Sequence, residues 1–265
     1  MMQPIGVFDS GVGGLSVWRE IVNQLPQENI IYFADNANCP YGTKTQDEII
    51  TLASKIVDFF ISQNVKLVVV ACNTATAAAI DYLRQNYSIP FIGMEPAVKP
   101  AALQTKTGCV GILATNGTLG GQLFKRTKDK YANDINVIVQ PGTGLVELVE
   151  AGEYHSEKAK VLLKKYIDPM LLKHADHIVL GCTHYPFFRP LIDDIAGKGV
   201  KIIDPAPAVA RQTKDVLGRI KSLEENSSRL YKFMCSGSAE TLKEILTNAI
   251  KLDISNVEII EHVKI

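Results

Sequence analysis

The sequence predicts an α/β fold with doubly wound, largely parallel sheets, and three observations support that prediction. Short runs rich in Val and Ile alternate with segments of helical periodicity along most of the 265 residues. The runs are apolar almost throughout, which is typical of strands buried on both faces of a parallel sheet. Eight or more such runs are many for one open sheet, so we expect two α/β lobes with right-handed crossovers.

Eight apolar runs are the clearest expected strands: Pro4–Asp9, Asn29–Ala34, Lys66–Ala71, Pro90–Gly93, Gly108–Ala114, Asn136–Gln140, His177–Gly181 and Val200–Asp204. Two more candidates, Leu230–Cys235 and Val257–Ile260, flank an expected helix at Ala239–Ala249. The polar segment Lys221–Arg229 between the two groups is expected to be a loop.

The helices are expected between these strands. Thr45–Gln63 repeats its apolar residues with the 3.6-residue period, and Thr45 with Glu48 forms a capping-box pattern at its start. Another helix should begin near Leu15. A third should begin at Ser156, and Pro169 is expected to bend or divide it.

Charge and cysteine usage exclude several classes of protein. Lys plus Arg and Asp plus Glu number 28 each, so a strong electrostatic footprint for nucleic acid or an anionic membrane is not expected. The apolar runs are far shorter than the ~18 residues of a membrane span, and no secretory signal is recognised. Five cysteines without a CxxC pair argue against a disulfide framework. We therefore expect a soluble protein of the cytoplasm.

Two of the cysteines lie in similar sequence segments. VVVACNTA at Val68–Ala75 and IVLGCTHY at Ile178–Tyr185 each place a cysteine after a buried strand, where a helix should begin. Ligand sites of open α/β sheets lie beyond such strand ends, so Cys72 and Cys182 are candidate reactive thiols. A helix N-terminus favours thiolate, so we expect their pKa values below about 8.5. The adjacent Asn73, Thr74 and Thr183 could hold a small polar ligand.

Polar groups at two other positions could act together with Cys72 and Cys182. Asp9 ends the first strand before a Gly-rich turn, where it would point into the ligand crevice or serve only as a capping residue. The turn is neither a GxGxxG nor a Walker motif. His184 could act as base, acid or charge partner for Cys182. Zinc held by Cys72, Cys182 and His184 is disfavoured, because no fourth ligand is evident, and no metal is expected.

The remaining candidates carry weaker signals. Glu147 and Glu150 share a helix face, where surface solvation is the usual outcome and a role near His184 cannot be read from spacing. Cys109 and Cys235 lie in apolar strand patterns and should be core residues. Cys39 has no evident partner in the sequence and is taken as structural.

Together these motifs resemble the glutamate racemases, cofactor-independent enzymes that make D-glutamate for bacterial peptidoglycan. The matching segments are Phe8–Val17 (FDSGVGGLSV), Cys39–Lys44 (CPYGTK), Ala71–Ala75 (ACNTA) and Gly181–Pro186 (GCTHYP). The resemblance implies that Cys72 and Cys182 exchange protons with the substrate, that Asp9 assists the first thiol, and that His184 and Glu150 assist the second. It places around the amino acid Asp9, Ser10, Tyr41, Gly42, Asn73, Thr74, Thr118, Thr183 and His184.

The family fold implied by the resemblance has two pseudo-symmetric lobes with the active site between them. Residues 1–96 and 207–265 would form one lobe and residues 97–206 the other. The resemblance further implies a homodimer and allows an interaction with DNA gyrase, with no cofactor, no membrane and no direct nucleic-acid contact. At Gln140–Gly144 the chain departs from the family's usual cysteine–proline and bulky apolar residues. The sequence therefore does not predict the shape of the active-site wall near this segment.

The expected reaction is a two-base racemisation, in which one thiolate removes the α-proton and the opposite thiol donates another. Three alternatives remain open from the sequence. The chain could be a racemase of the same superfamily for aspartate or another carboxylate, a hydrolase using Cys182 with His184, or a non-catalytic binding or regulatory protein.

Overall fold

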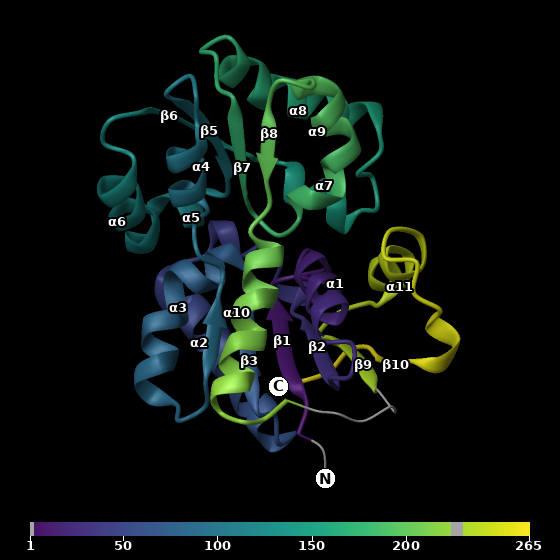
Figure 1. Ribbon diagram of the computed structural model, residues 1–265. Helices are drawn as coiled ribbons and strands as arrows, with labels where there is room; N and C mark the ends of the chain where they lie inside the picture. The colour runs from purple at the N-terminus through teal and green to yellow at the C-terminus, as the bar shows by residue number, and fades with distance from the viewer. Residues whose placement is uncertain (1–2, 224–229) are drawn as a thin grey trace.

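The computed structural model describes residues 3–223 and 230–265 and contains two parallel sheets, one in each of two lobes (Figure 1). The sheet in the lower lobe of the figure has the strand order β10-β9-β2-β1-β3-β4. All of its neighbouring strands pair in parallel. Its strands are β1 (Ile5–Asp9), β2 (Ile30–Ala34), β3 (Leu67–Val70), β4 (Phe91–Gly93), β9 (Tyr231–Cys235) and β10 (Glu258–Ile260).

The sheet in the upper lobe has the order β6-β5-β7-β8, again with parallel pairing. Its strands are β5 (Cys109–Ala114), β6 (Asn136–Pro141), β7 (His177–Gly181) and β8 (Lys201–Ile203). The chain therefore crosses from the first sheet to the second after β4 and returns after β8. The carboxyl ends of β1, β3 and β7 meet where the lobes face each other (Figure 1).

Helices cover both sheets. Those of the lower lobe are α1 (Leu15–Gln24), α2 (Gln46–Ser62), α3 (Asn73–Asn86), α10 (Ala206–Arg219) and α11 (Glu240–Asn248). Those of the upper lobe are α4 (Val98–Gln104), α5 (Asn116–Gly120), α6 (Gln122–Tyr131), α7 (Leu145–Glu150), α8 (Glu157–Leu171) and α9 (Arg189–Ala196). Four short 3₁₀ turns complete the described elements: η1 (Asn36–Asn38), η2 (Tyr41–Thr43), η3 (Tyr185–Phe188) and η4 (Ile254–Asn256).

The alternation of side chains along β1 divides the core into two layers. Val7 packs with Trp18 of α1 on one face of the sheet, and Phe8 packs with Phe60 of α2 on the other. The layer that contains Val7 continues into the upper lobe as far as Leu180 of β7. One apolar core therefore links the two lobes and fixes the strand ends relative to each other.

The fold prediction is confirmed, and all ten expected strands are present. The capping box forms, with the Thr45 N–H donating to Glu48 Oε2 at 2.7 Å, and Ser156 caps α8 by accepting from the Ala159 N–H at 3.1 Å. Pro169 does not divide α8, because it lies in the last turn, where its missing N–H costs one hydrogen bond. Within the loop expected at Lys221–Arg229, residues 224–229 lie outside the described residues, and the lobe limits at 96/97 and 206/207 stay predictions.

Among the described residues no helix is both long enough and apolar enough to cross a bilayer. All five cysteines are free thiols.

The ion pair between Lys66 and Glu28 should stabilise the lower lobe. Lys66 Nζ lies 2.7 Å from Glu28 Oε2, and the two side chains are 4% and 1% exposed. Lys66→Met removes a buried cationic partner of the Glu28 carboxylate and should lower the free energy of unfolding by about 3–5 kcal/mol, measured by chemical denaturation. Arg189→Met, which breaks the half-exposed pair with Asp193, should cost no more than about 1 kcal/mol. Equal losses in the two variants would contradict the prediction.

Candidate active site

A closed crevice lies where the carboxyl ends of β1, β3 and β7 face each other. It encloses only about 10 Å³ and is lined from both lobes by Ser10, Pro40, Tyr41, Gly42, Cys72, Asn73, Thr74, Thr115, Val146, Cys182, Thr183 and His184. Cys72 follows β3 in one lobe and Cys182 follows β7 in the other, yet both thiols reach the same cavity. The two similar sequence segments around Cys72 and Cys182 therefore contribute to one site between the lobes.

Cys72 is the N-cap residue of α3. Its Sγ accepts a hydrogen bond from the Ala75 N–H at 3.3 Å and lies 3.7 Å from Ser10 Oγ. The pKa expected from the helix N-terminus is wrong in direction. Burial and the nearby Asp9 charge raise the pKa of the Cys72 thiol and outweigh the lowering by the Ala75 and Ser10 hydrogen bonds. Cys72 is therefore a neutral thiol at pH 7.

Asp9 lies fully buried at the end of β1, behind Cys72. Its Oδ2 accepts from the Gly14 N–H at 2.9 Å and from the Gly11 N–H at 3.3 Å, and its Oδ1 accepts from Thr183 Oγ1 at 3.4 Å. Burial raises the pKa of Asp9, although the His184 charge and the Gly14 hydrogen bond oppose that shift. Asp9 thus holds the Gly-rich turn and interacts with the Cys72 thiol, but it is not among the residues that line the crevice, so a catalytic or substrate-binding role for Asp9 stays a prediction.

Cys182 begins a chain of polar contacts that ends in the opposite lobe. Its Sγ lies 3.7 Å from His184 Nδ1, and His184 Nε2 lies 2.6 Å from Glu150 Oε1. The same carboxylate oxygen accepts from the Val12 N–H at 2.7 Å. Burial lowers the pKa of His184, but its interactions with Cys182, Cys39 and Glu150 raise it more, so the pKa lies well above its usual value. The imidazole is therefore cationic beside Cys182.

Glycine is required where the β1–α1 turn meets this chain. A Cβ at Gly11 would overlap the Glu150 carboxylate, and one at Gly13 would overlap the His184 ring. Ser16 Oγ of the same turn donates to the Thr183 carbonyl at 3.0 Å. The glycines thus permit close approach of the two lobes.

Cys39 is the residue that sequence reasoning missed. It follows η1 in the lower lobe and is partly buried, and its Sγ lies within 4.8 Å of a ring nitrogen of His184 in the upper lobe. Burial raises the pKa of Cys39 to about 11, although its contact with His184 opposes the shift. The assignment of Cys39 as purely structural is therefore incomplete, because its partner lies 145 positions away. Cys109 and Cys235 are buried in strands, as expected.

The other predicted binding residues are placed as follows. Ser10, Tyr41, Gly42, Asn73, Thr74 and Thr183 line the crevice, whereas Thr118 lies behind it and contacts Thr115 Oγ1 at 3.0 Å. Tyr41 Oη donates to Asp35 at 2.6 Å, so that hydroxyl is already engaged. Among the described residues Asn73 Oδ1 has no hydrogen-bond partner although Asn73 is buried, so it offers an acceptor to a ligand.

The departure at Gln140–Gly144 leaves a turn that contacts Tyr185 and Tyr166. Tyr185 Oη donates to the Gly142 carbonyl at 3.2 Å, and Tyr166 Oη donates to the Thr143 carbonyl at 2.8 Å. Gly144 has a φ of +86°, a conformation that favours glycine, and it caps α7, which carries Glu150. The turn therefore positions Glu150 indirectly.

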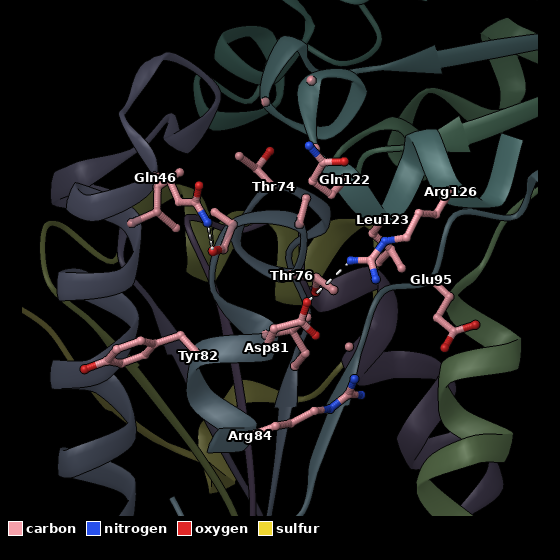
Figure 2. A pocket seen from close by; sticks show the side chains of 18 of the residues that line it. Gln46, Thr74, Thr76, Asp81, Tyr82, Arg84, Glu95, Gln122, Leu123 and Arg126 are labelled. Carbon is pink, nitrogen blue, oxygen red and sulfur yellow. Dashed lines mark hydrogen bonds and ion pairs between the residues drawn. The ribbon is translucent and has the colours of Figure 1, made fainter. Parts of the chain in front are cut away.

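A cleft of about 390 Å³ lies outside the crevice, between α3 and the α5–α6 segment (Figure 2). Asp81 and Arg126 pair across it at 3.6 Å, and Thr74 lines both the cleft and the crevice. Thr74 Oγ1 lies 2.8 Å from Thr115 Oγ1 at the boundary between the two spaces. This pair of threonines separates the thiols from the cleft.

Comparisons with known proteins agree on one family. The model of the Asp/Glu/hydantoin racemase family matches residues 5–213. The glutamate racemase of Herpetosiphon aurantiacus is 52% identical over 86% of this chain and 89% of its own. A glutamate racemase isoform of Bacillus anthracis has a TM-score of 0.87 at 31% identity, over 97% of this chain and 96% of its own. The Francisella tularensis glutamate racemase, solved with D-glutamate, has a TM-score of 0.85 at 30% identity, over 99% of this chain and 97% of its own.

Removing the Asp9 charge should lower the pKa of Cys72. Asp9→Asn keeps a carbonyl acceptor for Gly14 but removes the charge that disfavours the Cys72 thiolate. The pH midpoint of the Cys72 thiol, followed by NMR of the chain with ¹³C-labelled cysteine, should therefore fall. Cys109, whose pKa responds to burial and to Asp176 instead, is the internal reference and should not change. A midpoint for Cys72 that stays constant or rises would show that Asp9 does not control this thiol.

Proposed function

The chain belongs to the Asp/Glu/hydantoin racemase family, and we propose that it interconverts L- and D-glutamate with Cys72 and Cys182 as its proton carriers. The observation that supports these roles best is the meeting of two thiols, one from each lobe, in a single closed crevice. Inversion at a carbon requires a base on one side and an acid on the other, which two facing thiols supply.

The surroundings of the two thiols differ. Burial and the Asp9 charge raise the pKa of Cys72, whereas Cys182 Sγ lies 3.7 Å from His184 Nδ1, a group that can exchange a proton with it. Racemisation needs this asymmetry, because one sulfur must accept a proton while the other donates one. We therefore assign Cys182 as the first base of the resting enzyme and Cys72 as the first acid.

The proposed step conserves protons and electrons. The Cys182 thiolate takes the α-proton, the electron pair of the C–H bond stays on carbon, and the Cys72 thiol delivers its proton to the opposite side of that carbon. Cys182 then carries a thiol and Cys72 a thiolate, which is the correct state for the reverse reaction. Asp9, with its raised pKa, can take up a proton near Cys72. Near Cys182, a proton can move between His184 Nε2 and Glu150 Oε1.

The remaining crevice residues would orient the substrate. Asn73 Oδ1 can accept from the substrate ammonium, and the hydroxyls of Ser10, Thr74 and Thr183 can donate to its carboxylates. Oriented donors matter because α-deprotonation creates carbanion-like charge on a molecule that is already anionic. General acid–base groups contribute about 10²–10⁴-fold, so positioning supplies the rest of the acceleration.

We assign to the D-glutamate product the role of a precursor for peptidoglycan in the cytoplasm. The family needs no cofactor for this chemistry, and the proposed steps use only side chains of the chain. A homodimer and an interaction with DNA gyrase, both implied by the resemblance, stay predictions.

Replacing either crevice thiol by serine tests the assignment. Cys72→Ser and Cys182→Ser should each lower glutamate racemisation by at least about 10²-fold, because a serine hydroxyl is far less acidic than a thiol. In D₂O each variant should still exchange the α-proton of the enantiomer that faces its remaining thiol. Chirality and α-deuterium are followed together from L- and from D-glutamate.

Cys109→Ser, which removes a buried thiol outside the crevice, is the matched control and should racemise glutamate as the unaltered chain does. Racemisation at the unaltered rate without either crevice sulfur rejects the two-thiol scheme. Activity on aspartate alone selects the other racemase, and a covalent acyl adduct on Cys182 selects the hydrolase.

A further inference from the structure

We propose that Cys39, Glu150 and His184 form a binding site for a thiophilic divalent cation of the zinc class, and that occupation of this site inactivates the enzyme. The inactivation rests on the racemase function proposed above, whereas the binding does not. The site uses Cys39, which the proposed reaction leaves without a role.

The three side chains offer the donor set that zinc prefers. One thiol sulfur, one imidazole nitrogen and one carboxylate oxygen lie within 4.8 Å of one another. Zinc binds such atoms at about 2.0–2.3 Å in a tetrahedral arrangement, and three protein ligands leave one position for water. The 2.6 Å separation of His184 Nε2 and Glu150 Oε1 would have to open by about 1 Å, which side-chain rotation can supply.

A separate cavity gives a cation access to Cys39 and Glu150, whereas His184 lines the crevice. It measures about 310 Å³ and is lined by Asn36, Cys39, Pro40, Val146, Glu147, Glu150 and Ala151. Cys39 and Glu150 line this cavity and not the crevice, so a metal ion can reach them without passing the substrate site. The Glu147 carboxylate borders the same cavity and adds a second negative charge on the approach, which attracts a dication.

Cys39 is better placed for this role than the two crevice thiols. Within the described residues, the group of Cys39, Glu150 and His184 is the one in which three such ligand atoms converge. The zinc site considered from the sequence, with Cys72, Cys182 and His184, does not appear there. The geometry thus moves the candidate metal site from the substrate crevice to its outer side.

Binding would change the protonation of His184 without any redox step. The cation displaces the proton of the Cys39 thiol and the proton that His184 Nε2 shares with Glu150, and both protons pass to solvent. New bonds form from the metal to sulfur, nitrogen and oxygen. Because the metal then holds His184 and Glu150, the imidazole can no longer exchange a proton with Glu150 while it supports Cys182.

Cobalt(II) titration of the full chain tests the binding. A thiolate bound to cobalt gives a charge-transfer absorption in the near ultraviolet, and calorimetry with Zn²⁺ gives the affinity. We expect the absorption in the unaltered chain, in Cys109→Ser and in Cys72→Ser, and its loss in Cys39→Ser. Zinc affinity should fall by more than about tenfold in Cys39→Ser, since even loss of an outer-shell partner costs 10–100-fold.

Glu150→Gln provides a second variant that keeps the side-chain shape, and it should also weaken zinc binding while retaining the cobalt absorption. Matching circular dichroism spectra for all variants exclude loss of fold. Absorption that survives in Cys39→Ser and disappears in Cys72→Ser would place the metal on the crevice thiols and overturn the proposal. Absence of the absorption from the unaltered chain would overturn it as well.

Inhibition forms the second part of the test. Zn²⁺ should inhibit glutamate racemisation by the unaltered chain, EDTA should reverse the inhibition, and Cys39→Ser should need more than about tenfold higher zinc, relative to its own activity without metal. If cobalt binds at Cys39 but zinc does not inhibit racemisation, the proposed inactivation is wrong, whereas the proposed metal site stands. A chain that binds cobalt through Cys39 but does not racemise glutamate would refute the proposed function alone.

Discussion

The arrangement of the site depends on the contact between the β1–α1 turn of one lobe and Glu150 and His184 of the other. The Val12 N–H donates to Glu150, and Ser16 donates to the Thr183 carbonyl. A hydrogen bond to a charged carboxylate away from solvent is stronger than one between neutral groups. Glycine at positions 11 and 13 allows the approach, since a side chain at either would displace a polar group of the second lobe. Together with the apolar core that links the lobes, this contact holds the carboxyl ends of β3 and β7 at one cavity.

The same contact places different charged groups beside the two thiols. Two carboxylates, Asp9 and Glu150, lie on either side of a buried imidazole, but Asp9 faces Cys72 and the imidazole faces Cys182. The similar placement of the two cysteines after β3 and β7 therefore does not extend to their charged neighbours. Cys72 caps a regular helix, whereas Cys182 is followed by a bend and the short η3 turn before α9 begins. Two thiols in similar strand positions thus have different surroundings.

The sequence predicted the fold and the two thiols well because both depend on local patterns. A continuous apolar run followed by a polar residue identifies the end of a buried parallel strand, and Asp9, Cys72 and Cys182 all occupy such ends. Long-range contacts were not accessible in this way. The partner of Cys39 lies in another lobe, and the pKa direction at Cys72 failed because the helix N-terminus was considered without the burial and the Asp9 charge that oppose it. Glu150 could be placed near His184 only through the resemblance.

The crevice volume of about 10 Å³ is room for about one water molecule, so an amino acid cannot enter unless the lobes separate. The contacts that close the two sides of the crevice differ in strength. On the side of the α3–α5 cleft they are one neutral threonine pair and an exposed ion pair between Asp81 and Arg126, which contribute little because water competes for them. On the side of the β1–α1 turn they are buried and involve charge. The interface is therefore weaker at Thr74 and Thr115, where the cleft of Figure 2 borders the crevice, than at the turn that contacts Glu150 and His184. The charged groups beside Cys182 thus belong to the stronger side of the interface, and their arrangement does not depend on the threonine pair.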